Sequence, residues 1–168
     1  MRPVELALRP LEADDLDDLA VWRQRPENAG CFMGHVPVTA SGQMDWYQAY
    51  LQDDREMLFV LFDAEGKRFG MAGLGNIDYK NQKAEFGRFL IGDPQMRGRG
   101  YGRLILEKMV GFGFDELNLR KIYLRVFADN DAAIALYEKV GFRREGLLRD
   151  DHFSAGRWRD VLLMAVFR

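Results

Sequence analysis

The stretch FLIGDPQMRGRGYGR, residues 89–103, joins an apolar strand to a long helix through a glycine-rich bend. Small residues allow several consecutive N–H groups to point into one concavity at the positive end of the helix dipole. Such a concavity suits phosphate oxygens. The flanking arginines (Arg97, Arg99 and Arg103) favour an anionic ligand over a tight turn without one. The stretch therefore predicts a strand, an anion-binding bend and a helix in succession.

Two common nucleotide-binding signatures do not fit this bend. A P-loop requires Gly-Lys followed by Ser or Thr at the start of the helix, whereas Gly102 is followed by Arg103 and Leu104. A dinucleotide-binding fingerprint requires Gly-x-Gly-x-x-Gly, whereas the glycines occupy positions 98, 100 and 102. The bend is therefore not a nucleoside triphosphate site, and it is a poor match to a dinucleotide site.

Hydrophobic periodicity on either side of the bend predicts a mixed α/β sheet with helices on both faces. Strands are expected at residues 6–9, 57–62, 69–78, 84–91, 121–126, 143–149 and 158–167, and helices at 14–24, 39–51, 103–116 and 132–140. The three strands between residues 57 and 91 are joined by short turns and form an antiparallel meander. Because neither repeats nor linkers interrupt this order, residues 1–168 are expected to form a single domain.

The composition excludes several classes of partner. The net charge is −2 over 168 residues, so no basic surface for nucleic acid or anionic membrane is expected. No stretch approaches the ~18 consecutive apolar residues of a membrane span. A lone cysteine, Cys31, cannot form an intrachain disulfide, which fits a cytoplasmic protein. With Cys31, His35 and His152 as the only soft ligands, no metal site is expected.

Two blocks of the sequence resemble the GNAT superfamily of N-acetyltransferases. Residues 97–102, RGRGYG, resemble the family signature Arg/Gln-x-x-Gly-x-Gly/Ala, which cradles the pyrophosphate of CoA. Residues 130–142, NDAAIALYEKVGF, are similar to its second block, Asn-x-x-Ala-x-x-x-Tyr-x-x-x-Gly-Phe. The resemblance covers nearly the whole chain and points to the subgroup of ribosomal-protein N-terminal, spermidine and nucleotide-amino-sugar acetyltransferases. It implies a twisted, mostly antiparallel sheet whose parallel pair splays apart near residues 90–92 and 121–126.

The same resemblance implies acetyl-CoA as the acyl donor and assigns residues to it. The backbone amides of Leu90, Ile91 and Gly92 would bond the pantetheine arm in the gap of the sheet, and Asn130 would contact the arm as well as cap its helix. The bend would hold the pyrophosphate through Arg97, Gly98, Arg99, Gly100, Tyr101, Gly102 and Arg103.

Acetyl transfer requires a neutral amine and a protonated leaving group. A free amine with a pKa near ~10 is mostly protonated at neutral pH, so a base is needed. Glu85 is the first candidate, on the strand that enters the site, with a solvent-facing residue paired with Lys83 or Arg88 as the alternative. His35 and His152 are further candidates because an imidazole accepts a proton near neutral pH. The resemblance makes Tyr137 the general acid beside the CoA sulfur, with a packing tyrosine as the alternative.

The acceptor amine is expected to be a small molecule bound by the first two helices and the loop between them. The aromatic and basic residues there suit a nucleotide-linked amino-sugar: Trp22, Arg23, Arg25, His35 and Trp46. A polyamine would require an acidic pocket, which the four aspartates of residues 14–18 could supply, although they are more typical of a solvated helix face.

Other functions stay open at this point. A ribosomal-protein N-terminus or an aminoglycoside are further candidate acceptors. A non-catalytic acyl-CoA-binding module and a purely structural domain are alternatives to an enzyme, and Tyr137 and the anion-binding bend disfavour them respectively. By analogy, the aromatic-rich C-terminal strand could join two subunits in a homodimer.

Overall fold

A single twisted sheet forms the centre of the protein in the computed structural model, which describes residues 5–31 and 38–168. The strand order is β1-β2-β3-β4-β5-β7-β6, and every neighbouring pair is antiparallel except β4 and β5. The strands are β1 (Ala7–Pro10), β2 (Met57–Phe62), β3 (Arg68–Asp78), β4 (Lys83–Ile91), β5 (Lys121–Phe127), β6 (Arg143–Ser154) and β7 (Arg157–Phe167). The mixed sheet and the antiparallel meander β2-β3-β4 are thus confirmed.

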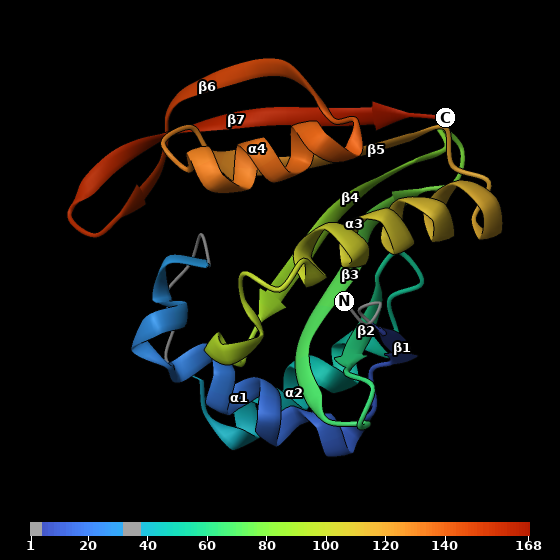
Figure 1. Cartoon of the computed structure of the whole chain (residues 1–168), viewed down its shortest axis with the longest axis vertical. Helices are drawn as coiled ribbons and strands as arrows, with labels where there is room; N and C mark the ends of the chain where they lie inside the picture. The colour runs from blue at the N-terminus through green and yellow to red at the C-terminus, as the bar shows by residue number, and fades with distance from the viewer. Residues whose placement is uncertain (1–4, 32–37) are drawn as a thin grey trace.

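Two pairs of helices cover the two faces of this sheet (Figure 1). One face carries α1 (Leu16–Gln24) and α2 (Ala40–Tyr50), and the other carries α3 (Tyr101–Gly111) and α4 (Asp131–Val140). Short 3₁₀ turns at Ala13–Asp15, Pro26–Cys31 (η2) and Pro94–Met96 connect the elements, and a π-helical turn, Phe112–Glu116, extends α3. Asp131–Val140 begins at an N-cap, Asn130, whose side chain accepts a bond from Ala133 N, and ends at Gly141 in the left-handed conformation.

Two of the differences between the observed and expected boundaries have a clear physical cause. Helix α3 begins at Tyr101 rather than Arg103, because Gly100 at its N-cap adopts φ +87° and the helix starts directly after it. Strands β6 and β7 form a hairpin that extends to Ser154, beyond the expected end at Arg149. Charged residues in this extension hide the strand pattern from the sequence, whereas pairing with β7 holds it in place.

The parallel pair β4–β5 separates early. Pairing covers Lys83–Lys121, Ala84–Ile122 and Glu85–Tyr123, and then stops. Beyond that point β4 continues along β3, and β5 continues along β7. The expected splay is confirmed, although it begins at Phe86 rather than at residues 90–92.

A β-bulge in β4 explains the separation. Gly87 lies opposite Gly73 and Leu90 opposite Met71, so β4 has an extra residue in this interval. Arg88 within it adopts φ +51°. A bulge bends its strand and increases the local twist, which turns β4 away from β5.

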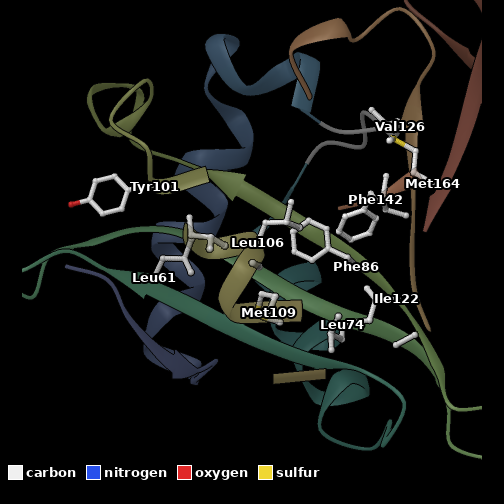
Figure 2. Close-up of a cluster of buried hydrophobic side chains, with 14 of the residues drawn as sticks. Leu61, Leu74, Phe86, Tyr101, Leu106, Met109, Ile122, Val126, Phe142 and Met164 are labelled. Atoms are coloured by element: carbon white, nitrogen blue, oxygen red, sulfur yellow. The ribbon is translucent and has the colours of Figure 1, made fainter. Parts of the chain in front are cut away.

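One hydrophobic core joins the two diverging halves of the sheet. Figure 2 shows Phe86 of β4 and Ile122 of β5 packed in the same cluster as Leu106 and Met109 of α3. Leu106 and Ile122 are each 0% exposed. The core therefore fixes the width of the gap between β4 and β5 from the α3–α4 side.

Candidate active site

A cavity of about 260 Å³ lies where β4 and β5 part. It brings together residues from six helices and strands: Leu19 and Arg23 from α1, Gln43 and Trp46 from α2, Met71 from β3, Glu85 to Phe89 from β4, Arg125 from β5, and Tyr137 from α4. A second cavity adjoins it through Glu85, Gly87 and Arg88, and is also lined by Asp53, Arg55, Glu56, Gly75 and Asn76. Four of the predicted site residues, Glu85, Tyr137, Arg23 and Trp46, therefore share one cavity.

Tyr137 is held at the cavity by aromatic packing. Its ring centroid lies 6.4 Å from that of Phe86 and 6.0 Å from that of Phe142. Phe142 is 0% exposed and anchors the turn that follows α4. The phenol is therefore presented to the cavity by a ring whose position the core determines.

Glu85 forms the last pair between β4 and β5 and lies where the two cavities meet. Its Oε2 accepts a hydrogen bond from Asn76 Nδ2 at 2.7 Å. Arg88 forms its ion pair with Glu56, at 3.0 Å, instead of with Glu85. Burial raises the pKa of Tyr123, the partner of Glu85 in parallel register, and the negative charge of Glu85 raises it further. Asn76 thus holds the carboxylate in place without neutralising it.

The glycine-rich bend has the backbone geometry that an anion cradle requires. Gly98 and Gly100 adopt φ +71° and +87°, which a side chain with a Cβ rarely tolerates. No protein atom lies within 4 Å of a Cβ built at either glycine, so this side of the backbone is open. Arg99 and Arg103 are exposed beside it, and Arg103 bonds Glu107 at 2.7 Å. Tyr101 packs its ring against the core, with its centroid 4.7 Å from that of Phe69.

Arg97, which was expected to bind the pyrophosphate, bonds to groups of the protein itself. Its guanidinium donates to the carbonyls of Glu27 (3.2 Å) and Ile91 (3.1 Å) and to Asn28 Oδ1. The side chain thus ties the end of β4 to η2. Arg97 positions the strand that the pantetheine arm would meet.

Gly92, which was expected to bond the pantetheine arm, is hydrogen-bonded within the protein. Its N–H donates to Phe69 O at 2.7 Å, and its carbonyl accepts from Arg25 Nη1 (3.0 Å) and Asn28 Nδ2 (3.2 Å). Backbone N–H groups of successive strand residues point to opposite sides, so Leu90 N–H also faces β3 and Ile91 N–H faces the gap. Of the three amides expected to bond the arm, that of Ile91 faces the gap and the other two face β3.

The expected acceptor-binding residues divide into two groups. Trp22 is 4% exposed and packs directly under Gly92, where a Cβ would lie 2.2 Å from its Cγ. Arg25 donates to the Gly92 carbonyl. Neither is among the described residues that line the cavity, whereas Arg23 and Trp46 are. His35 lies outside the described residues.

His152 is placed away from the cavity. Its ring lies on β6, 5.5 Å from Phe127, and it is not among the residues that line either cavity at the gap. It is therefore not placed to act as the base.

Three polar residues of the cavity were missed from the sequence: Gln43, Arg88 and Arg125. Gln43 is three positions before Trp46, so it lies on the same face of α2, and this spacing was an available signal. Arg88 enters through the β4 bulge, which no local pattern marks. Arg125 lies two positions after Tyr123 on β5, and its ion pair with Asp151 appears only in the folded sheet.

The aspartates of residues 14–18 do not form a polyamine pocket. Asp15 is 0% exposed and pairs with Arg9 at 2.6 Å and with Arg68 at 3.0 Å. Asp14 and Asp18 also pair with Arg68, at 3.0 and 3.1 Å. The expectation of a solvated face is wrong for Asp15, which links α1 to β1 and β3.

Two properties concern the described part of the chain as a whole. Within residues 5–31 and 38–168, no cluster of three or more His, Cys, Asp or Glu side chains has the arrangement of a metal site. No helix among these residues is long and apolar enough to span a membrane.

Residues 5–143 match the family model for the acetyltransferase (GNAT) domain. The chain belongs to the GNAT acetyltransferase family. It is 32% identical over 165 residues to the spermidine N(1)-acetyltransferase of Vibrio cholerae, which covers 98% of this chain and 94% of the relative. The enzyme of the same name from Escherichia coli is 32% identical over 164 residues, covering 96% and 85%. A putative ribosomal N-acetyltransferase of Bacillus subtilis is 26% identical over 166 residues, covering 96% and 88%.

Solved GNAT structures share the fold. The crystal structure of the Vibrio cholerae spermidine N-acetyltransferase in complex with CoA and spermine superposes with a TM-score of 0.89 at 32% identity, covering 96% of this chain and 95% of that one. The family match and these relatives confirm the expected fold, an N-acetyltransferase activity and acetyl-CoA as donor. This GNAT chain is an enzyme, and the non-catalytic alternatives are set aside.

Proposed function

We propose that the cavity at the gap is the acetyl-transfer site, with Glu85 as the base, Tyr137 as the acid and a small-molecule primary amine as the acceptor. One observation carries this proposal. Glu85 and Tyr137 are far apart in the sequence and lie on different elements beside the gap, yet both line the one cavity at the point where β4 and β5 stop pairing.

Acetyl-CoA would bind along the edge of β4 that faces β5. Beyond Glu85 the edge of β4 that faces β5 pairs with no strand of residues 5–31 or 38–168, and such an edge is a template for an extended chain. The pantetheine arm would occupy this edge and accept from Ile91 N–H. Its pyrophosphate would meet the N–H groups of residues 98–103, with the charges of Arg99 and Arg103 beside it.

The chemistry is a direct transfer without an acyl-enzyme. Glu85 takes a proton from the ammonium group, and the neutral amine attacks the thioester carbon. The new C–N bond forms as the C–S bond breaks, and the phenol of Tyr137 delivers its proton to the leaving thiolate. The nitrogen of the new amide then loses its second proton, which restores the phenol, and the proton taken up by Glu85 passes to solvent. Asn76 keeps Glu85 oriented through its 2.7 Å hydrogen bond. A proton acceptor, Glu85, therefore acts on the attacking amine, and a proton donor, Tyr137, acts on the leaving sulfur.

Spermidine and a nucleotide-linked amino-sugar are the two candidate acceptors. The Vibrio cholerae and Escherichia coli relatives are named for spermidine, and the adjoining cavity contains the carboxylates of Asp53 and Glu56. Of the residues expected to bind a nucleotide-linked amino-sugar, Arg23 and Trp46 line the cavity, whereas Trp22 is buried and Arg25 bonds to Gly92. The cavity, at about 260 Å³, is also smaller than the ~300–1,000 Å³ typical of sites that enclose larger ligands. It therefore suits the amine end of a ligand better than a whole nucleotide.

Thiol release from acetyl-CoA with a panel of amines tests the proposal. The panel comprises spermidine, glucosamine, a nucleotide-linked amino-sugar, an aminoglycoside and a peptide with a free N-terminus. The expected result is amine-dependent release that Tyr137→Phe and Glu85→Gln each suppress while acetyl-CoA still binds. Amine-dependent release at the wild-type rate in both variants would overturn the assignment of the site.

Two further predictions from the sequence belong to this proposal. A cytoplasmic location follows from the expected lack of disulfides, and fractionation of cells checks it. A homodimer is expected through the C-terminal hairpin, where Phe153 and Trp158 are 58% and 60% exposed and their ring centroids lie 5.3 Å apart. Light scattering of the wild type and of Trp158→Ser tests that expectation.

A further inference from the structure

Two arginines meet at the acceptor side of the cavity. Arg23 of α1 and Arg88 of the β4 bulge both line it. Burial lowers the pKa of the Arg23 guanidinium, and the positive charge of Arg88 lowers it further. Arg88 is held in place by its 3.0 Å ion pair with Glu56 and by the ring of Trp46, whose centroid lies 5.6 Å from the guanidinium carbon. The two like charges are thus close enough to repel one another on the wall of a partly enclosed cavity.

A buried amide lines the same cavity. Gln43 of α2 is 5% exposed, and its Nε2 has no hydrogen-bond partner among the described residues. Buried side-chain donors are nearly always paired, because an unpaired donor loses its bond to water without replacement. An oxygen atom of a bound ligand is the kind of partner that this donor requires.

Carboxylates do not dominate this cavity. Among the described residues that line it, Glu85 is the only acidic one, against Arg23, Arg88 and Arg125. Arg88 and Arg125 have carboxylate partners, Glu56 and Asp151, so the cavity is not strongly cationic either. A polyamine would place its further ammonium groups next to guanidinium groups, whereas an anionic oxygen would relieve the repulsion between Arg23 and Arg88.

We infer that the acceptor amine carries an anionic oxygen group, a carboxylate or a phosphate, that Arg23, Arg88 and Gln43 bind. This inference rests on the proposed acetyl-transfer site. The anion lies at the α1–α2 side of the cavity and the amine lies toward Glu85, so the two ends of the acceptor meet groups of opposite charge. The enzyme would thereby select substrates different from the polycations for which its relatives are named.

Matched pairs of amines test the charge of the acceptor. Lysine differs from cadaverine by one carboxylate, and glucosamine 6-phosphate differs from glucosamine by one phosphate. The expected result is a kcat/KM for the anionic member of at least one pair that exceeds that of its neutral or cationic counterpart and of spermidine by about 10-fold or more. The pair that shows the difference identifies carboxylate or phosphate as the group bound.

The wild-type panel also separates this inference from the proposed function. Efficient acetylation of spermidine or cadaverine with no gain from either anion overturns the anionic acceptor and leaves the acetyl-transfer site standing. The lack of thiol release with any amine, in protein that binds acetyl-CoA, overturns the transfer site and with it the inference.

Variants locate the anion site. Arg23→Met and Gln43→Met are each expected to lower kcat/KM for the preferred anionic amine by about 10- to 100-fold and to change that for its uncharged or cationic counterpart little. Arg23→Lys should recover part of the loss. Arg144→Met is the matched control, because Arg144 is an ion-paired arginine on β6, with its side chain 60% exposed. Melting temperature and acetyl-CoA affinity confirm that each variant is folded. Equal losses for both members of the pair would overturn the assignment of these residues.

Discussion

Replacing Tyr137 by Phe removes the proposed acid with little change in packing. The contacts of the ring with Phe86 and Phe142, at centroid distances of 6.4 and 6.0 Å, do not involve the hydroxyl group. Positioned general acids contribute about 10²- to 10⁴-fold in rate, or about 3 to 5 kcal/mol of activation free energy. The cavity of about 260 Å³ has room for water, and a water molecule near the sulfur would supply a weaker acid. The expected loss is therefore toward the lower end, about 10²- to 10³-fold.

Single-turnover measurement of acetyl transfer is the appropriate assay, because slow product release masks a lost acid in the steady state. Calorimetry with acetyl-CoA should give an affinity close to that of the wild type. Tyr79→Phe is the matched control: its hydroxyl donates to the Asp54 carbonyl at 3.1 Å, its side chain is 50% exposed, and it lines neither cavity at the gap. A Tyr137→Phe enzyme that transfers acetyl as fast as Tyr79→Phe would refute the role of Tyr137 as acid.

Four further outcomes are expected. Glu85→Gln should lower kcat/KM by about 10²-fold at neutral pH. The activity of this variant should recover as the pH rises toward the pKa of the amine, because the substrate is then already neutral. A ratio of variant to wild-type kcat/KM that does not change with pH would count against Glu85 as a base. Gly100→Val should weaken acetyl-CoA binding by calorimetry because φ is +87° there, whereas Gly111→Ala, at φ −58°, should not; equal affinities would place the pyrophosphate elsewhere. Gly92→Ala puts a Cβ 2.2 Å from Trp22 Cγ and should lower the free energy of unfolding in urea by about 1–3 kcal/mol. The hydrogen bond from Lys67, at 2.9 Å, lowers the pKa of Asp93, so the ionised carboxylate stabilises the fold above its unfolded pKa of about 4 and loses that effect as the pH falls. The Tm of Asp93→Asn should therefore lie below that of the wild type at pH 7 and approach it in acid. A difference in Tm that stays constant with pH would refute this.

Local sequence determined the elements that depend on neighbouring residues. Strand β2 has the expected bounds, Met57–Phe62, because polar turns flank a short run of apolar residues whose length suits a buried strand. The cap at Asn130 and the left-handed Gly141 delimit α4 as expected. The bend at Gly98 and Gly100 was also recognisable, because positive φ values at a strand-to-helix junction require glycine. These features, with the two family blocks, were enough to predict the fold and the acetyl donor.

The direction of individual side chains was decided by contacts between distant segments. Arg97 turns inward because Asn28 and Ile91 accept its hydrogen bonds, and Trp22 is buried because Gly92 leaves room for its ring. Arg88 reaches the cavity only because the β4 bulge shifts the alternation of the strand. Local patterns carry no record of such contacts, since each depends on where another segment packs. The sequence alone therefore determined the fold and the chemistry of the donor, whereas the tertiary structure decided which side chains meet the acceptor.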